Sequence, residues 1–250
     1  MKISHTSGAQ GVLEIVIDNP DKRNSLDNEM IGYVIRHLSQ GQRLTIIRSQ
    51  GKYFCSGRDI SDIDPLDPRA MHPLRDLALA LRTAAHPVVV VVQGDAIGLG
   101  VSIACWADIC IASRNAGFCI PESRIGIAPT ITADSLAEIV GRKRCLDMCM
   151  TGRKISAEEA HEYGIVQYVV DATELDAATV KTVNAILLSA PEAISISKAL
   201  LNRRTEAAFM HGLEEACKQA TIAVGTETAR EGLEAFRTKR RPSWIPEGVL

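Results

Sequence analysis

The sequence predicts an α/β protein with a helical C-terminal region. Val88 to Val92 are five consecutive valines, and so short a β-branched run is typical of a strand buried on both faces. Strand-like and helical segments alternate over about two thirds of the chain, whereas residues 191–250 are patterned as helix throughout. We therefore expect an α/β core over residues 1–190 and a C-terminal helical region over residues 191–250.

The first half of the chain supplies most of the predicted strands. Val12 to Asp18 reads as a strand, and Asp27 can cap a helix that runs to about Leu38. A second strand follows at Arg43 to Arg48. The proline-rich stretch Asp62 to Pro73 is predicted as a loop, and a helix is expected over Leu74 to Ala85.

A glycine-rich turn leads into the second half. Gly94 to Gly100 follows the valine strand and feeds a helix that reaches about Ala107. Asp108 to Ala112 is predicted as a further strand. From Ser135 onward the pattern is helical, interrupted by one strand at Ile165 to Val170, and Pro191 is placed to begin a helix in its first turn.

Bulk composition narrows the function classes. Apolar residues make up 46% of 250 residues, which argues against disorder, and the net charge of −2 argues against a basic nucleic-acid binder. The seven cysteines form no C-x-x-C pair, and no cysteine–histidine set has ligand spacing, so we expect reduced thiols and no metal site. Neither a signal core nor a membrane span is evident, so we expect a cytoplasmic protein.

The glycine-rich turn admits several interpretations. Gly98 and Gly100 begin a dinucleotide fingerprint, but Ile103 stands where its third glycine belongs. A phosphate-binding P-loop lacks its closing Gly-Lys-Ser/Thr. The turn can be purely structural, or its backbone N–H groups at a helix N-terminus can stabilise an oxyanion.

Several motifs in one order resemble the crotonase (enoyl-CoA hydratase/isomerase) superfamily. They span Ile15 to Val166 and comprise Asn19 to Leu26, Phe54 to Ile60 (F-x-x-G-x-D-I), Gly94 to Gly100, Phe118 to Glu122, and Thr151 to Val166. The resemblance implies a spiral of stacked ββα units with a C-terminal helical region. It also implies an acyl-CoA thioester substrate bound in the core of residues 1–190, and no cofactor beyond the coenzyme A of that substrate. It further implies a homotrimer or dimer of trimers, with residues 191–250 as the oligomerisation region.

The resemblance also implies site residues. The two oxyanion donors correspond to the backbone N–H groups of Arg58 and Leu99. The Arg58 side chain can pair with a carboxylate or phosphate, or simply be exposed to solvent. Further substrate-binding positions are Lys22, Arg23, Ser56, Gly57, Asp59, Ile60, Gly98 and Thr130.

The reaction depends on the side chains near the acyl carbon. In the hydratase pattern two glutamates act on one water; these positions are Ser102 and Glu122 here, so only one carboxylate is present. A serine hydroxyl is too weak an acid–base group to replace the other. One glutamate can still move a proton between carbons, which favours double-bond isomerisation of a 3-enoyl-CoA.

Alternatives remain open at this point. Ser102 can hold water beside Glu122 in a hydratase or hydratase-lyase, and a decarboxylase or thioester hydrolase is possible. Glu122 can also be a structural carboxylate on a surface loop. Separately, a protein of the same fold can have lost catalysis and bind only a partner or acyl-CoA. The basic run Arg237 to Arg241 is interpreted as a solvated helix end, with RNA contact as the weaker alternative.

Overall fold

The computed structural model describes residues 2–8, 10–60, 67 and 69–246. Two sheets form its centre. A six-stranded sheet has the order β1-β2-β3-β5-β7-β10 and a smaller one the order β4-β6-β8-β9. The strands of the two sheets are β1 (Ile3–Ser7), β2 (Val12–Ile17), β3 (Leu44–Ser49), β4 (Tyr53–Cys55), β5 (Val88–Val92), β6 (Asp95–Ile97), β7 (Ile109–Ser113), β8 (Gly117–Cys119), β9 (Lys154–Ser156) and β10 (Tyr168–Val170).

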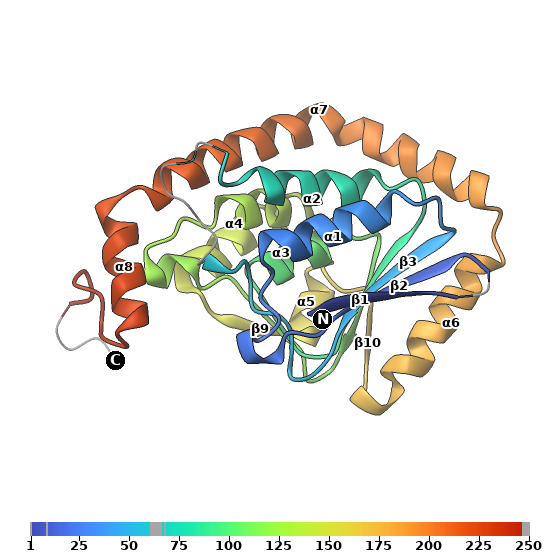
Figure 1. Cartoon of the computed structure of the whole chain (residues 1–250), viewed down its shortest axis with the longest axis horizontal. Helices are drawn as coiled ribbons and strands as arrows, with labels where there is room; N and C mark the ends of the chain where they lie inside the picture. The colour runs from blue at the N-terminus through green and yellow to red at the C-terminus, as the bar shows by residue number, and fades with distance from the viewer. Residues whose placement is uncertain (1, 9, 61–66, 68, 247–250) are drawn as a thin grey trace.

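Helices lie above the sheets and on both sides of them in the view of Figure 1. They are α1 (Asn28–Leu38), α2 (His72–Thr83), α3 (Leu99–Trp106), α4 (Thr130–Thr151), α5 (Ala157–Glu162), α6 (Leu175–Leu187), α7 (Pro191–Val224) and α8 (Glu227–Arg237), with 3-10 turns η1 (Pro20–Lys22), η3 (Glu122–Ile125) and η4 (Ala172–Glu174). This α/β architecture with a helical C-terminal region confirms the predicted fold class.

Strand β5 shows how the sequence builds the centre. Its five valines are fully buried; Val88, Val90 and Val92 pack into the main core, while Val89 and Val91 face the cluster under α6. Alternate side chains of a strand point to opposite faces, so this strand is apolar on both sides because both sides are covered. The expectation of a doubly buried strand is confirmed.

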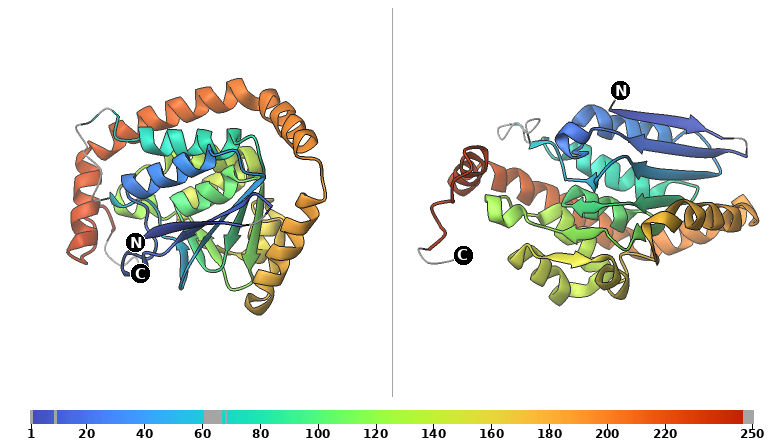
Figure 2. Two further views of the ribbon diagram at one scale, coloured as in Figure 1. Left: turned by 45° about the vertical axis from the view of Figure 1, so that its right-hand side comes forward. Right: turned by 90° about the horizontal axis from the view of Figure 1, so that it is seen from below.

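The long helix α7 places the C-terminal end of the chain over the core. It packs against α2 and α4, and the left view of Figure 2 shows it arching over the molecule before the chain turns down into α8. Contacts between α8 and η3 bring the last described helix close to Glu122–Ile125. The basic run that ends α8 is exposed, as expected for a solvated helix end. Domain limits at residue 190 stay a prediction, although α7 begins at Pro191.

Several boundaries differ from expectation. The strand predicted over Ile165 to Val170 is confined to Tyr168–Val170, because the N–H groups of Ile165 and Val166 donate to Ala160 in a turn after α5. Helix α4 begins at Thr130 rather than Ser135, and Gly141 kinks it with φ +76°. Part of the predicted loop Asp62 to Pro73 (residues 62–66 and 68) lies outside the described residues.

Candidate active site

One cavity of about 610 Å³ collects the predicted site residues. It lies between the segments around η1 and β4, the N-terminal ends of α2, α3 and α4, the turn η3, and the ends of α7 and α8. The structure brings to its wall Lys22, Arg23, Ser56, Gly57, Arg58, Asp59, Ile60, Gly98, Leu99, Ser102, Glu122 and Thr130. Their proximity is therefore a property of the fold, while their individual roles stay predictions.

Glu122 is held rigidly at this wall by the turn η3. The turn is closed by the Ile127 N–H, which donates to the Glu122 carbonyl, and by Ser123, whose hydroxyl donates to the Cys149 carbonyl. On the outside α8 lies so close that a Cβ on Gly232 would be 2.2 Å from the Ile125 carbonyl oxygen. The backbone that carries the Glu122 carboxylate is therefore held by hydrogen bonds on one side and by the packing of α8 on the other.

The Glu122 carboxyl is poorly solvated. Its Oε2 is buried and has no hydrogen-bond partner among the described residues. Its Oε1 lies so close to Gly98 that a Cβ on that residue would be only 2.1 Å from it. Burial raises the pKa of Glu122 to about 7, opposed in part by a backbone hydrogen bond. A carboxyl with this pKa exchanges protons readily near neutral pH.

The turn before α3 provides the space for that carboxyl. Gly98 has φ +53° and donates its N–H to the Cys119 carbonyl at 3.0 Å. Helix α3 begins at the next residue, so the N–H of Leu99 is one of the first-turn donors that have no intrahelical acceptor. Gly100 packs against β4, since a Cβ there would be 2.6 Å from the Cys55 carbonyl oxygen.

The second predicted donor lies on the segment after β4. Gly57 has φ +108°, which favours glycine, and its carbonyl accepts from the Leu26 N–H at 3.0 Å. The Asp59 N–H donates to the Leu26 carbonyl at 2.8 Å, so Arg58 pairs with Leu26 in a short parallel bridge. Two backbone segments, one at Arg58 and one at Leu99, thus face the same cavity.

Polar side chains deeper in the cavity are engaged within the protein. The fully buried Ser102 hydroxyl donates to the Thr132 hydroxyl at 3.0 Å, and the Thr130 hydroxyl donates to the Ala216 carbonyl at 2.7 Å. Thr132 was not among the predicted site residues. Its only signal in the sequence is its place after Pro129 at a helix start, which fixes no particular role.

The mouth of the cavity carries charge. Lys22 forms an ion pair with Asp59 at 2.5 Å, and the Arg23 guanidinium lies 5.6 Å from the ring centre of Tyr53. Arg124 donates to the Thr151 carbonyl through Nε and Nη2. Basic groups at the rim suit an anionic ligand that enters there.

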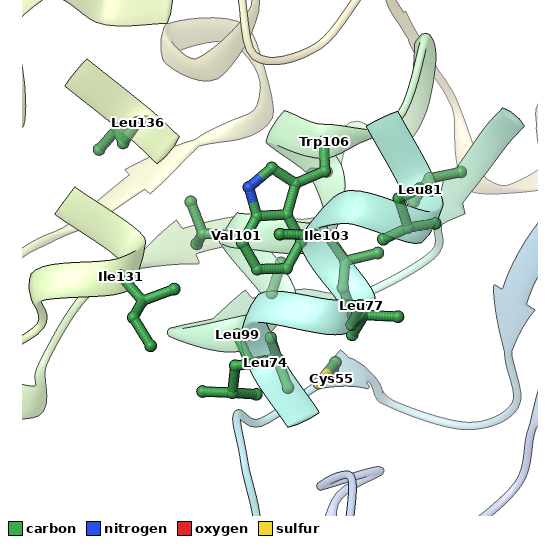
Figure 3. Close-up of a cluster of buried hydrophobic side chains, with 14 of the residues drawn as sticks. Cys55, Leu74, Leu77, Leu81, Leu99, Val101, Ile103, Trp106, Ile131 and Leu136 are labelled. Atoms are coloured by element: carbon green, nitrogen blue, oxygen red, sulfur yellow. The ribbon is translucent and has the colours of Figure 1, made fainter. Parts of the chain in front are cut away.

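Apolar side chains form the inner wall. Leu74 of α2, Leu99 of α3 and Ile131 of α4 come to the cavity from three helices, and Cys55 lies to the right of Leu74 (Figure 3). Each of the three is at most 8% exposed. This apolar wall belongs to the cavity that also contains Glu122, and its composition suits a hydrocarbon group.

No group of side chains with metal-ligand geometry is found in the described part of the chain. Within the same residues, no helix has both the length and the apolar composition needed to cross a bilayer. All seven cysteines fall in the described ranges and are free thiols.

Comparisons with known proteins agree on one family. The sequence model of the enoyl-CoA hydratase/isomerase family matches residues 7–247. A probable mitochondrial enoyl-CoA hydratase 2 of Arabidopsis thaliana is 30% identical, with 97% of this chain and 84% of that protein covered. The 1,2-epoxyphenylacetyl-CoA isomerase of Escherichia coli is also 30% identical, with 97% of each chain covered.

A solved structure shows the same architecture. The crystal structure of an enoyl-CoA hydratase from Mycobacterium avium subsp. paratuberculosis superposes with a TM-score of 0.88 at 28% identity, covering 98% of this chain and 99% of that chain. The relatives include a hydratase and an isomerase, so likeness alone does not select the reaction.

Proposed function

Because the chain belongs to the enoyl-CoA hydratase/isomerase family, we propose that it isomerises the double bond of a 3-enoyl-CoA thioester with Glu122 as its single proton-transfer base. The observation that carries this is the state of the Glu122 carboxyl, which is buried, has a pKa of about 7, and lies beside the helix start at Leu99. A base of that pKa can remove an α-proton and, once protonated, return it to the γ-carbon.

The oxyanion is stabilised by backbone donors in this proposal. The thioester carbonyl oxygen becomes an enolate when the α-proton leaves, and the N–H groups of Arg58 and Leu99 donate to it. The N-terminus of α3 adds a partial positive charge at the same place. The coenzyme A phosphates interact with the basic side chains at the mouth, which are those of Lys22, Arg23 and Arg124.

The isomerase is favoured over a hydratase because the cavity has a hydroxyl pair in place of a second carboxylate. Ser102 and Thr132 hydrogen-bond to each other, so neither can activate water as a carboxylate would. The same pair supports the second candidate, a hydratase or hydratase-lyase in which these hydroxyls hold a water while Glu122 moves its proton.

The deciding experiment follows protons and products together. Purified protein is incubated in D2O with 3-enoyl- and 2-enoyl-CoA thioesters, and the products are identified by mass spectrometry beside the Glu122→Gln variant. We expect isomerised or α-deuterated product that disappears in Glu122→Gln. Hydrated product would favour the second candidate. Binding of the thioester without exchange or turnover would refute catalysis and indicate an acyl-CoA binding protein.

Assembly into a homotrimer or dimer of trimers is part of the proposal. Large apolar side chains are exposed along α7, among them Ile196 at 70%, Leu200 at 61% and Leu201 at 62%. Exposed apolar surface of this kind is typical of subunit contacts. Light scattering after size-exclusion chromatography gives the mass, and a monomer at micromolar concentration would contradict the assembly. The cytoplasmic location stays a prediction, since one relative is named as mitochondrial.

A further inference from the structure

The side chain of Arg58 connects three parts of the structure that meet at the cavity. Its Nη1 donates to the Ala70 carbonyl at 2.7 Å and lies 3.3 Å from the Met71 sulfur, while Nη2 donates to the Asn28 side-chain oxygen at 3.1 Å. A guanidinium has donors in a planar fork, so one side chain can reach partners in two directions.

Each partner belongs to an element that shapes the site. Asn28 is the first residue of α1, and Met71 is the N-cap of α2 and lines the cavity. The Arg58 backbone is itself paired with Leu26 on the other side. The peptide that carries one proposed oxyanion donor is therefore fixed both through its main chain and through its own side chain.

We propose that Arg58 is a positioning residue: its guanidinium ties the donor-bearing peptide to the starts of α1 and α2, and so holds the oxyanion donor and the Met71 wall at a fixed separation. This inference rests on the proposed enolate chemistry. Such fixing is useful because a donor stabilises the enolate oxygen only when it is preorganised within hydrogen-bond reach of it.

The geometry also argues against an acyl carboxylate as the partner of Arg58. The fork already donates to a backbone carbonyl and an amide oxygen of the protein. Turning the fork towards a substrate carboxylate would break both hydrogen bonds, and the carbonyl of Ala70, a residue that is 7% exposed, would lose its donor at a cost in stability. We expect no preference for carboxylated acyl groups from this residue.

Three variants test the assignment. Arg58→Met keeps the length but removes the donors, and Arg58→Lys keeps the charge and a single donor group. Arg43→Met is the matched control, because Arg43 also donates to backbone carbonyls (Leu187 and Ser189) but is not among the cavity residues. Each variant is assayed for α-proton exchange with an apolar enoyl-CoA and with an ω-carboxylated one of equal length.

The expected result is a fall in kcat by about 10-fold to 100-fold in Arg58→Met, of equal size for both substrates and with a smaller change in KM. Arg58→Lys recovers part of the rate, and Arg43→Met stays close to the wild type. Amide hydrogen exchange at residues 56–59 and 70–72 should be faster in Arg58→Met than in Arg43→Met.

Opposite outcomes overturn the assignment. A loss confined to the carboxylated substrate would make Arg58 a substrate-binding residue, and an unchanged kcat with unchanged amide exchange would make it dispensable. If the wild type exchanges no α-proton, the proposed function fails, while amide exchange still decides whether Arg58 holds these segments together. If Arg58→Met does not fold, Arg58→Lys provides the same comparison.

Discussion

Replacing Glu122 by glutamine should stabilise the protein in a pH-dependent way. Burial raises the pKa of this carboxyl from 4.5 to about 7 in the folded protein. Since one pKa unit equals about 1.4 kcal/mol, the ionised carboxylate is destabilised by about 3 kcal/mol relative to the unfolded chain. Glutamine has nearly the same shape and carries no charge, so it removes that destabilisation.

The direction in which the free energy of unfolding changes with pH follows from the protons that each state binds. Below pH 4.5 both states hold the proton, and Glu122 contributes no pH dependence. Between about 4.5 and 7 the unfolded chain has lost its proton and the folded protein has kept it, so the free energy of unfolding falls as pH rises. Above pH 7 the carboxyl is ionised in both the folded and the unfolded state, and the free energy of unfolding falls no further on its account. Relative to wild type, Glu122→Gln should therefore gain about 3 kcal/mol between pH 4.5 and pH 8.

Urea unfolding at a series of pH values measures this difference directly. The control is Glu162→Gln, which makes the same chemical change at an exposed residue of α5. A stability difference between wild type and Glu122→Gln that is constant with pH, or that changes in the opposite direction, would show that the carboxyl is solvated and would remove the main support for a neutral-pH base.

Four further substitutions test the site and the core around it. Gly98→Ala should lower kcat by about 10-fold or more, measured as α-proton exchange, because its Cβ would overlap the Glu122 carboxylate and displace the base; an unchanged kcat would place the carboxyl elsewhere. Ser102→Ala and Thr132→Val should each lower the free energy of unfolding by about 1 kcal/mol yet leave isomerisation unaffected, since the hydroxyls hydrogen-bond to each other; loss of turnover would favour the water-holding role. Leu77→Ala should lower the free energy of unfolding by about 2–5 kcal/mol in urea titrations, since this α2 side chain is 1% exposed and its truncation leaves a cavity; a smaller loss would indicate that the core can collapse.

The sequence predicted the elements that have a strong local signal. Helix α1 begins after Asp27, whose side chain accepts from the Met30 N–H as an N-cap. The valine run forms a strand buried on both faces. These features depend on neighbouring residues alone, either through capping or through the density of β-branched side chains.

Elements defined by distant contacts were missed. Strands β4, β6, β8 and β9 have three residues each, which is too short for any periodicity to appear. They exist because backbone groups such as those of Phe118 and Ile155 pair across the smaller sheet. The buried hydroxyl pair was missed for the same reason: Ser102 and Thr132 are thirty positions apart, and only packing of α3 against α4 joins them.

The candidate site was easier to locate than its chemistry because backbone groups supply its proposed donors. An N–H group donates in the same way whatever side chain follows it, so the turn at Gly98 and the bridge between Leu26 and Arg58 can preserve an oxyanion site while the side chains vary. The base is different, because its pKa depends on what surrounds it. The apolar wall of Leu99 and Ile131 belongs to the same cavity as Glu122, so in the proposed function one surface would both receive the acyl chain and raise the pKa of the carboxyl. Acyl specificity and base strength would then be linked, and a side chain that opens this wall towards water would also make Glu122 a weaker base.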